Sequence, residues 1–145
     1  MAVSNLPTFT QNVSNFNVSL TGTNVDTLGT NTYGASFTDS SNVNGARVTS
    51  LLLSTNVSSG NVIIYVYLVV ISTVYPIGSI SLPNGTGNAG TAALDALNPT
   101  NMPGLPVDNN GKPFIHLASN ATLGITIGTS VASNKVFGTA TIENY

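Results

Sequence analysis

The stretch Val62-Ile63-Ile64-Tyr65-Val66-Tyr67-Leu68-Val69-Val70-Ile71 decides the fold class of this 145-residue chain. It is the longest apolar run, and most of its residues are β-branched or aromatic, the types that strands favour. At ten residues it is too short for a membrane-spanning helix, which needs about 20. Alternate side chains of a strand point to opposite faces, so both faces of this strand are apolar and need cover. The run predicts a buried strand in a layered β protein.

The two faces of this strand have different expected neighbours. In a two-layer sandwich one face meets the core, whereas the other needs a loop of the chain, an arm or a neighbouring subunit. Since the window has no charge and no proline, leaving that second face exposed would promote aggregation. Arg47 lies on another predicted strand and is expected to make a fixed salt bridge or hydrogen bonds across an interface, or to be a solvated edge charge. The candidate interface residues are therefore Ile63, Tyr65, Tyr67, Val69, Ile71 and Arg47.

Shorter alternating segments surround the central run. Leu123, Ile125 and Ile127 alternate with small or polar residues, as in a strand with one buried face. Similar patterns predict strands over 9–20, 33–38, 45–54, 61–71, 74–82, 113–118, 121–128 and 135–143. Five of the seven prolines gather between 83 and 113, which predicts a long Pro/Gly-rich loop with at most one short helix, over 91–98. We expect an all-β fold, an antiparallel β-sandwich of the jelly-roll type with about eight strands.

Composition narrows the function classes. Only 6% of the residues are charged, against about 25% in an average soluble domain. Three scattered basic residues cannot neutralise a phosphate backbone, so we expect no nucleic-acid partner. With no cysteine and one histidine we expect no zinc site and no disulfide framework. A monomer with so few charges is poorly protected against association, which favours a protein that functions in an assembly.

Neither a linker nor an internal repeat divides the chain, so we expect a single domain over 1–145. The segment 1–8 is expected to be an arm that reaches a neighbour or a frayed end. It lacks the basic start and apolar stretch of a signal peptide, and no apolar run is long enough for a membrane helix. We therefore expect no membrane partner.

Three motifs suggest chemistry, and each has a simpler explanation. Gly85-Thr-Gly87-Asn-Ala-Gly90 matches the dinucleotide-binding pattern, but no βαβ unit surrounds it, so we expect a glycine loop. The segment 108–112 lacks the alternating acidic ligands and closing glutamate of a calcium loop, so we expect a tight turn. His116 has no nucleophile elbow to serve and is expected to be structural or partly exposed. We expect no enzyme, and no catalytic, cofactor-binding or metal-binding residues.

Three blocks resemble small structural proteins encoded in the head-gene regions of tailed bacteriophages. They are Asn44–Leu51 followed by Ser54-Thr55, Ile77–Pro83 with the glycine loop to Gly90, and Met102–Pro113 with the strand that follows. Together they cover roughly residues 33–145, and the third is the most specific. The family that they resemble is that of capsid cement, or decoration, proteins.

The resemblance implies a jelly-roll homotrimer or homodimer that binds the major capsid protein. Such a protein would be made in the host cytoplasm and lie on the outer surface of the virion, where it bridges and stabilises the shell. No cofactor is implied. The alternative hypothesis is a head-fibre or tail-knob module that recognises host glycans, although tryptophan is absent and aromatic residues make up only 7% of the chain.

Overall fold

The computed structural model describes residues 12–22, 35–37, 43–88 and 90–145, and within them the chain forms two antiparallel β-sheets packed against each other, without a helix. The strands are β1 (Asn12–Gly22), β2 (Ala35–Phe37), β3 (Ala46–Thr55), β4 (Val62–Val70), β5 (Thr73–Leu82), β6 (Leu94–Asp95), β7 (Ile115–Leu117), β8 (Thr122–Ile127) and β9 (Ala132–Asn144). The all-β prediction and most of the predicted strand positions are confirmed. The predicted arm over 1–8 lies outside the described residues.

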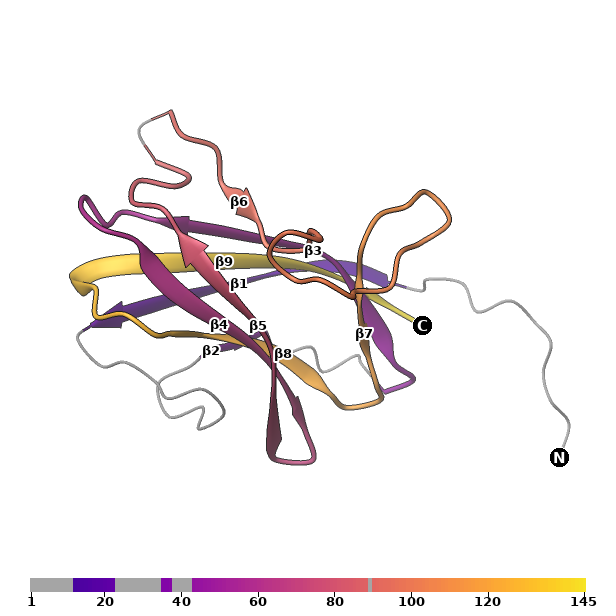
Figure 1. Ribbon diagram of the computed structural model, residues 1–145. Coiled ribbons are helices and arrows are strands. Elements are labelled where there is room, and N and C mark those ends of the chain that lie inside the picture. The colour runs from indigo at the N-terminus through magenta and orange to yellow at the C-terminus, as the bar shows by residue number, and fades with distance from the viewer. Residues whose placement is uncertain (1–11, 23–34, 38–42, 89) are drawn as a thin grey trace, which may run out of the picture.

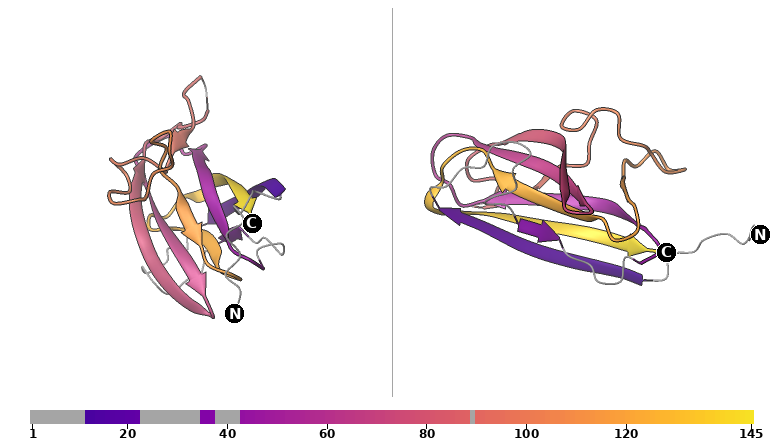
Figure 2. Two further views of the ribbon diagram at one scale, coloured as in Figure 1. Left: turned by 90° about the vertical axis from the view of Figure 1, so that its right-hand side faces the viewer. Right: turned by 90° about the horizontal axis from the view of Figure 1, so that it is seen from below.

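The two sheets form the layers of a β-sandwich (Figures 1 and 2). The five-stranded sheet has the order β1-β9-β3-β6, and β7 also pairs with β3. The four-stranded sheet has the order β2-β8-β4-β5. The sandwich is thus confirmed, while the finer jelly-roll assignment stays a prediction. β4 lies between β8 and β5, as expected for the most apolar strand of the chain.

The core lies between the sheets and follows the alternation of the strands. β4 contributes Val62, Ile64 and Val66, all at most 1% exposed, and β3 contributes Leu51 and Leu53 from the opposite sheet. Burying one side chain of this size contributes about 1.5–3 kcal/mol relative to leaving it exposed. The core therefore fixes which face of each strand is turned outward.

The short helix considered over 91–98 does not form. Leu94 and Asp95 instead pair with Leu53 and Leu52 as β6, and Ala96 and Leu97 are buried in the core. The Asp95 carboxylate accepts a hydrogen bond from the backbone N–H of Leu97 at 3.0 Å. Such a local bond competes with helix formation, and burial of the apolar residues against β3 then decides the outcome.

Candidate functional site

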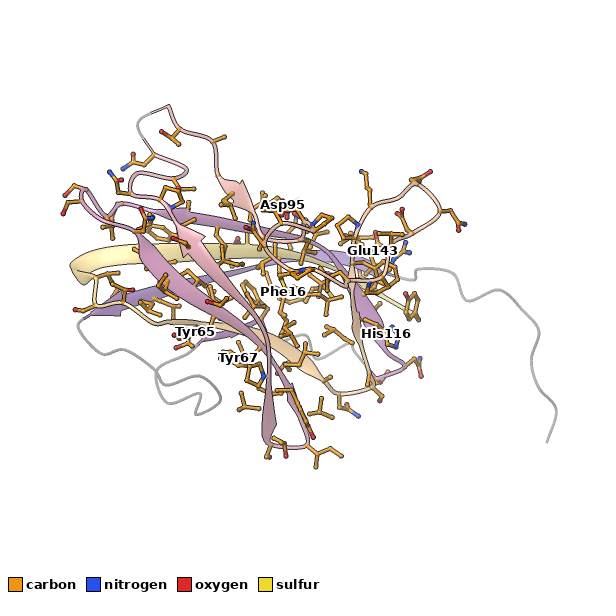
Figure 3. All side chains as sticks on the ribbon, in the orientation of Figure 1. Phe16, Tyr65, Tyr67, Asp95, His116 and Glu143 are labelled. Atoms are coloured by element: carbon orange, nitrogen blue, oxygen red, sulfur yellow. The ribbon has the colours of Figure 1, made fainter. Side chains whose placement is uncertain are left out.

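The outer face of β4 carries most of the predicted interface residues, and the chain covers part of this face itself. Ile63, Tyr65 and Val69 are half-buried there, whereas Tyr67 is only 2% exposed. Tyr67 is nonetheless absent from the core cluster between the sheets. Figure 3 shows both tyrosines on β4.

Glycines on β8 and just beyond its end make room for the two tyrosine rings. A Cβ atom at Gly124 would lie 2.3 Å from Cζ of Tyr67, and one at Gly128 would lie 2.6 Å from Cε2 of Tyr65. The rings thus occupy space that side chains on β8 would otherwise fill. Tyr67 consequently has little surface to offer a partner, while Ile63, Tyr65 and Val69 remain candidates.

The sequence pattern predicts Ile71 on the outer face of β4, and this prediction is wrong. Ile71 lies in the turn that joins β4 to β5. Val70 pairs with Thr73, so Ile71 and Ser72 form a two-residue hairpin loop. Their φ angles are 48° and 63°, in the left-handed region. Ile71 is 93% exposed at the end of a hairpin that projects from the sandwich (Figure 1).

Arg47 lies on the outer face of the five-stranded sheet and is held by Glu143. The two residues are paired across β3 and β9, and the Arg47 Nε–H donates to Glu143 Oε2 at 2.5 Å. This hydrogen bond to a carboxylate raises the pKa of Arg47 above its ordinary value. Their side chains are 32% and 20% exposed, so the pair is partly shielded from water.

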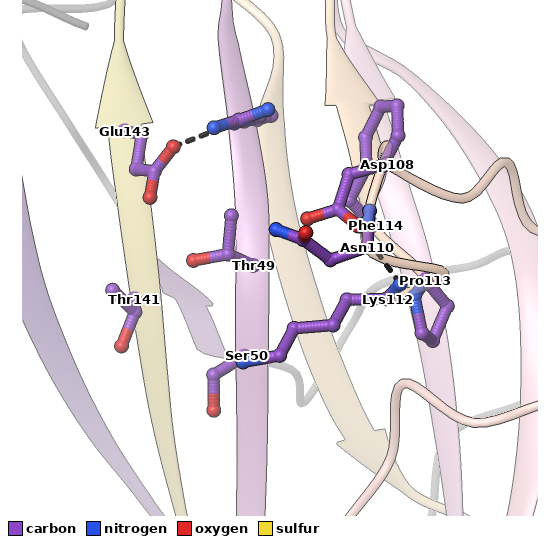
Figure 4. Close-up of a pocket in the computed structure, with 10 residues that line it drawn as sticks. Thr49, Ser50, Asp108, Asn110, Lys112, Pro113, Phe114, Thr141 and Glu143 are labelled. Atoms are coloured by element: carbon purple, nitrogen blue, oxygen red, sulfur yellow. Dashed lines mark hydrogen bonds and ion pairs between the residues drawn. The ribbon is translucent and has the colours of Figure 1, made fainter.

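A hollow of about 350 Å³, which we call the Arg47 hollow, lies over this pair (Figure 4). It is lined by Arg47, Thr49, Ser50, Asp108, Asn110, Lys112, Pro113, Phe114, Thr141 and Glu143. Four of these are charged, out of the three basic and five acidic residues of the whole chain. Two positive and two negative groups make the lining neutral overall, and Phe114 adds one aromatic wall.

The Asp108 turn forms the rim of the Arg47 hollow. Asp108 Oδ1 accepts hydrogen bonds from the backbone N–H groups of Asn110 at 2.8 Å and Lys112 at 2.9 Å. These bonds, chiefly that from Lys112, lower the pKa of Asp108. Gly111 closes the turn at φ 75°, and the expected tight turn is confirmed.

A second hollow, of about 300 Å³, lies at the opposite end of β3. We call it the Phe137 hollow; it is lined by Ser54, Thr55, Asn56, Gly87, Asn88 and Phe137. None of the described residues that line it is charged, and Phe137 is 40% exposed. Gly87, at φ 74°, belongs to the glycine motif, which packs as a loop against β3; no helix follows it in the described residues. No sequence pattern predicts this hollow, because its lining residues are far apart along the chain.

His116 lies on β7 and is exposed, as one of the two alternatives predicted. It pairs across the strands with Arg47, and its ring lies 6.5 Å from that of Tyr145. His116 and Glu143 thus lie at the same end of the sandwich (Figure 3). Among the described residues, no group of three or more histidine, aspartate or glutamate side chains is placed to hold a metal ion.

Comparison with protein-family models and with curated proteins yields no match for this chain. In the part of the chain that the structure describes, no helix has the length and apolar character needed to span a membrane.

Proposed function

We propose that this chain is a virion structural protein, a capsid cement protein that binds the outside of an icosahedral phage head. It would bridge neighbouring major capsid proteins by adhesion and change no covalent bond. Stable attachment of this kind needs a rigid surface and about 1,200–2,000 Å² of buried area, and repeated copies add avidity. A two-layer sandwich with a well-filled core meets the requirement for rigidity.

The observation that carries this proposal is the convergence of the three blocks that resemble cement proteins. Met102 of the third block packs on Gly78 of the second, where an added Cβ would lie 3.0 Å from the Met102 Cγ. Arg47 of the first block shares a hollow with Asp108 of the third. If the three blocks form one structural unit, they must contact one another although they are distant in sequence, and these contacts meet that requirement.

The outer face of the five-stranded sheet is the surface that we propose faces the shell. Thr139 Oγ1 donates to Asn17 Oδ1 and Thr141 Oγ1 to Asn15 Oδ1, both at 2.8 Å, so neighbouring strands hold these polar side chains in place. Ordered neutral groups can bond to a partner with a smaller desolvation cost than charges. The Arg47 hollow continues the same face towards β7.

Cryo-electron microscopy of virus particles from the source tests the assignment. We expect density for this β-sandwich on the outer surface of the head, at joints between capsid proteins. A terminase or portal gene beside the coding sequence would agree with this result. Particles that lack the chain, or that carry it only on a tail, would refute the cement role.

Rebinding to stripped particles tests the attachment face. Asn17 and Ser79 are both exposed, on the outer faces of the five-stranded and four-stranded sheets respectively. Asn17→Lys should weaken rebinding and lower the temperature at which the particles release DNA. The matched control Ser79→Lys should leave both unchanged; the reverse pattern would place the shell against the other sheet.

The Arg47 hollow favours the alternative candidate, a module that binds host glycans. Hydroxyl and amide groups from Thr49, Ser50 and Asn110 lie beside Phe114, and the charges of the lining cancel, which suits a neutral polyhydroxyl ligand. A glycan array probed with the purified chain distinguishes the candidates. Reproducible hits that Phe114→Ala abolishes would support the glycan module, and an empty array would count against it.

A further inference from the structure

The outer edge of β1 has no partner strand in the part of the chain that the structure describes. β1 is the outermost strand of the five-stranded sheet (Figure 2), and within those residues it pairs only with β9. An edge strand presents a row of backbone N–H and C=O groups on the side that faces away from its sheet. Such a row is a template on which another strand can pair.

The other edge strands are protected against such pairing, whereas β1 is not. β2, β6 and β7 have only two or three residues each. β5 contains Pro76, has a register shift against β4, and is packed by Met102 at Gly78. β1 has eleven residues with neither a charge nor a proline, and its register against β9 shifts only at its end, between Thr21 and Gly22. Since charge, proline, short length and irregular register are the usual protections of an edge, β1 is the described strand best suited to pair with another.

The side chains of β1 are also incompletely covered by their own molecule. Phe16 and Val18 pack against the core but are only part-buried. On the outer face, Asn15 Oδ1 and Asn17 Oδ1 accept hydrogen bonds from threonines of β9, while the NH2 groups of both amides have no acceptor among the described residues. A strand added beside β1 would bury more of the apolar side chains and would offer acceptors to the amides.

A second copy of β1 fits this edge. Antiparallel pairing of β1 with itself over its full length places Asn17, the midpoint of Asn12–Gly22, opposite Asn17 of the other copy. Directly opposed residues lie on the same face of a sheet, so Phe16 faces Val18 and Asn15 faces Ser19. Apolar side chains thus meet on the core side, and amides meet amides or hydroxyls on the outer side. Because β1 is uncharged, no like charges are brought together.

We propose that two copies of this chain pair through β1 about a two-fold axis, so that their five-stranded sheets become one continuous sheet. Antiparallel pairing over eleven residues makes about ten interchain backbone hydrogen bonds. The contact is isologous, so it closes at two copies and leaves no β1 edge for a third. The axis is perpendicular to the sheet, so the outer faces of both copies point the same way and form one surface. The value of this surface for shell attachment rests on the proposed function, whereas the pairing is tested on the purified chain without any shell.

Cysteine pairing tests the register, since the chain has no cysteine of its own. Asn17→Cys should form disulfide-linked homodimers under mild oxidation at least tenfold faster than Val13→Cys, although Val13 is 58% exposed on the same strand. In the proposed dimer the two copies of Val13 are about 26 Å apart, whereas the Cα atoms of a disulfide lie within about 7 Å. Val13 instead faces Thr21, so Val13→Cys mixed with Thr21→Cys should link readily although neither does so alone. Equal self-linking of Asn17→Cys and Val13→Cys, or linking of neither, would overturn the proposal.

Charge substitution at Val18 tests the association itself by sedimentation equilibrium. The wild-type chain should show a monomer–dimer equilibrium, and Val18→Lys and Val18→Glu should each weaken it at least tenfold, because like charges then flank the axis on the core side. An equimolar mixture of the two variants should regain the dimer, which unfolded chains would not do. The matched control Val74→Lys changes a part-buried valine on the edge strand β5 and should associate like wild type. A wild-type chain that stays monomeric, or a mixture that does, would overturn the proposal.

Rebinding of the purified chain to stripped particles separates this inference from the proposed function. A dimer that does not rebind would refute shell attachment but not the pairing through β1. A monomer that rebinds would refute the pairing but not shell attachment.

Discussion

The ring of Tyr67 on β4 occupies the space that a side chain at Gly124 on β8 would fill. The two residues are directly paired in the four-stranded sheet, and a Cβ added at Gly124 would lie 2.3 Å from Tyr67 Cζ. This contact explains how the outer face of a strand that is apolar on both faces is partly covered by residues of its own sheet.

Gly124→Ala should therefore destabilise the protein by displacing the tyrosine. Overpacking of a filled site costs about 1–3 kcal/mol, which urea denaturation can measure. The cost should shrink when Tyr67→Leu is also present, because the ring is then gone. A cost that is independent of residue 67 would contradict the contact.

The glycine motif allows a matched comparison. Gly85 and Gly87 have φ angles of 72° and 74°, but an added Cβ meets nothing within 4 Å at Gly85 and lies 2.4 Å from Ser54 Cβ at Gly87. Alanine at either site incurs the left-handed penalty of about 1–2 kcal/mol. Gly87→Ala should cost about 1–3 kcal/mol more in unfolding free energy. Ser54→Gly should remove that excess, and equal costs at the two glycines would show that the loop is not held against β3.

The Arg47–Glu143 pair should contribute modestly to stability. Its side chains are 32% and 20% exposed, and part-exposed ion pairs give coupling energies of about 0.2–1 kcal/mol. A double-mutant cycle with Arg47→Met and Glu143→Gln, followed by thermal unfolding, should give a value in this range that decreases in about 1 M salt. If salt does not change the coupling energy, the two charged groups are more shielded from water than their exposed fractions imply.

The Asp108 turn should be sensitive to acid. The backbone bonds from Lys112 and Asn110 lower the folded-state pKa, so the stabilisation is present above the unfolded-state pKa of about 4 and is lost as the pH falls through the lower, folded value. The amide NMR signals of Asn110 and Lys112 should therefore shift below about pH 4. In Asp108→Asn those shifts should disappear; their persistence would assign the titration to another group.

Sequence patterns located the strands well because burial and alternation are local properties. The strand at 62–71 can be predicted from its own residues alone, and β4 covers 62–70. The region 91–98 was harder, because Leu94 and Asp95 form a strand only when Leu52 and Leu53 are beside them. Local composition there is equally compatible with a short helix.

The Arg47 hollow and the cover of Tyr67 are harder to predict from the sequence, because their contacts join residues that are far apart along the chain. The sequence allows a salt bridge for Arg47 but does not name the partner, because Glu143 is 96 positions away. Finding that pair requires the register of β3 against β9, including the shift between Val48 and Ser50. The burial of Tyr67 likewise depends on a glycine on a strand that is remote in sequence.

The position of β9 has a consequence for biosynthesis. β9 (Ala132–Asn144) lies between β1 and β3, and both of these strands bond to it along most of their length. While a ribosome is still making residues 132–144, β1 and β3 have no central strand to join, and the apolar β4 has already emerged or is about to. A nascent chain must therefore keep the apolar β4 from pairing with neighbouring chains until β9 has been made, and misassembly is a risk throughout that interval.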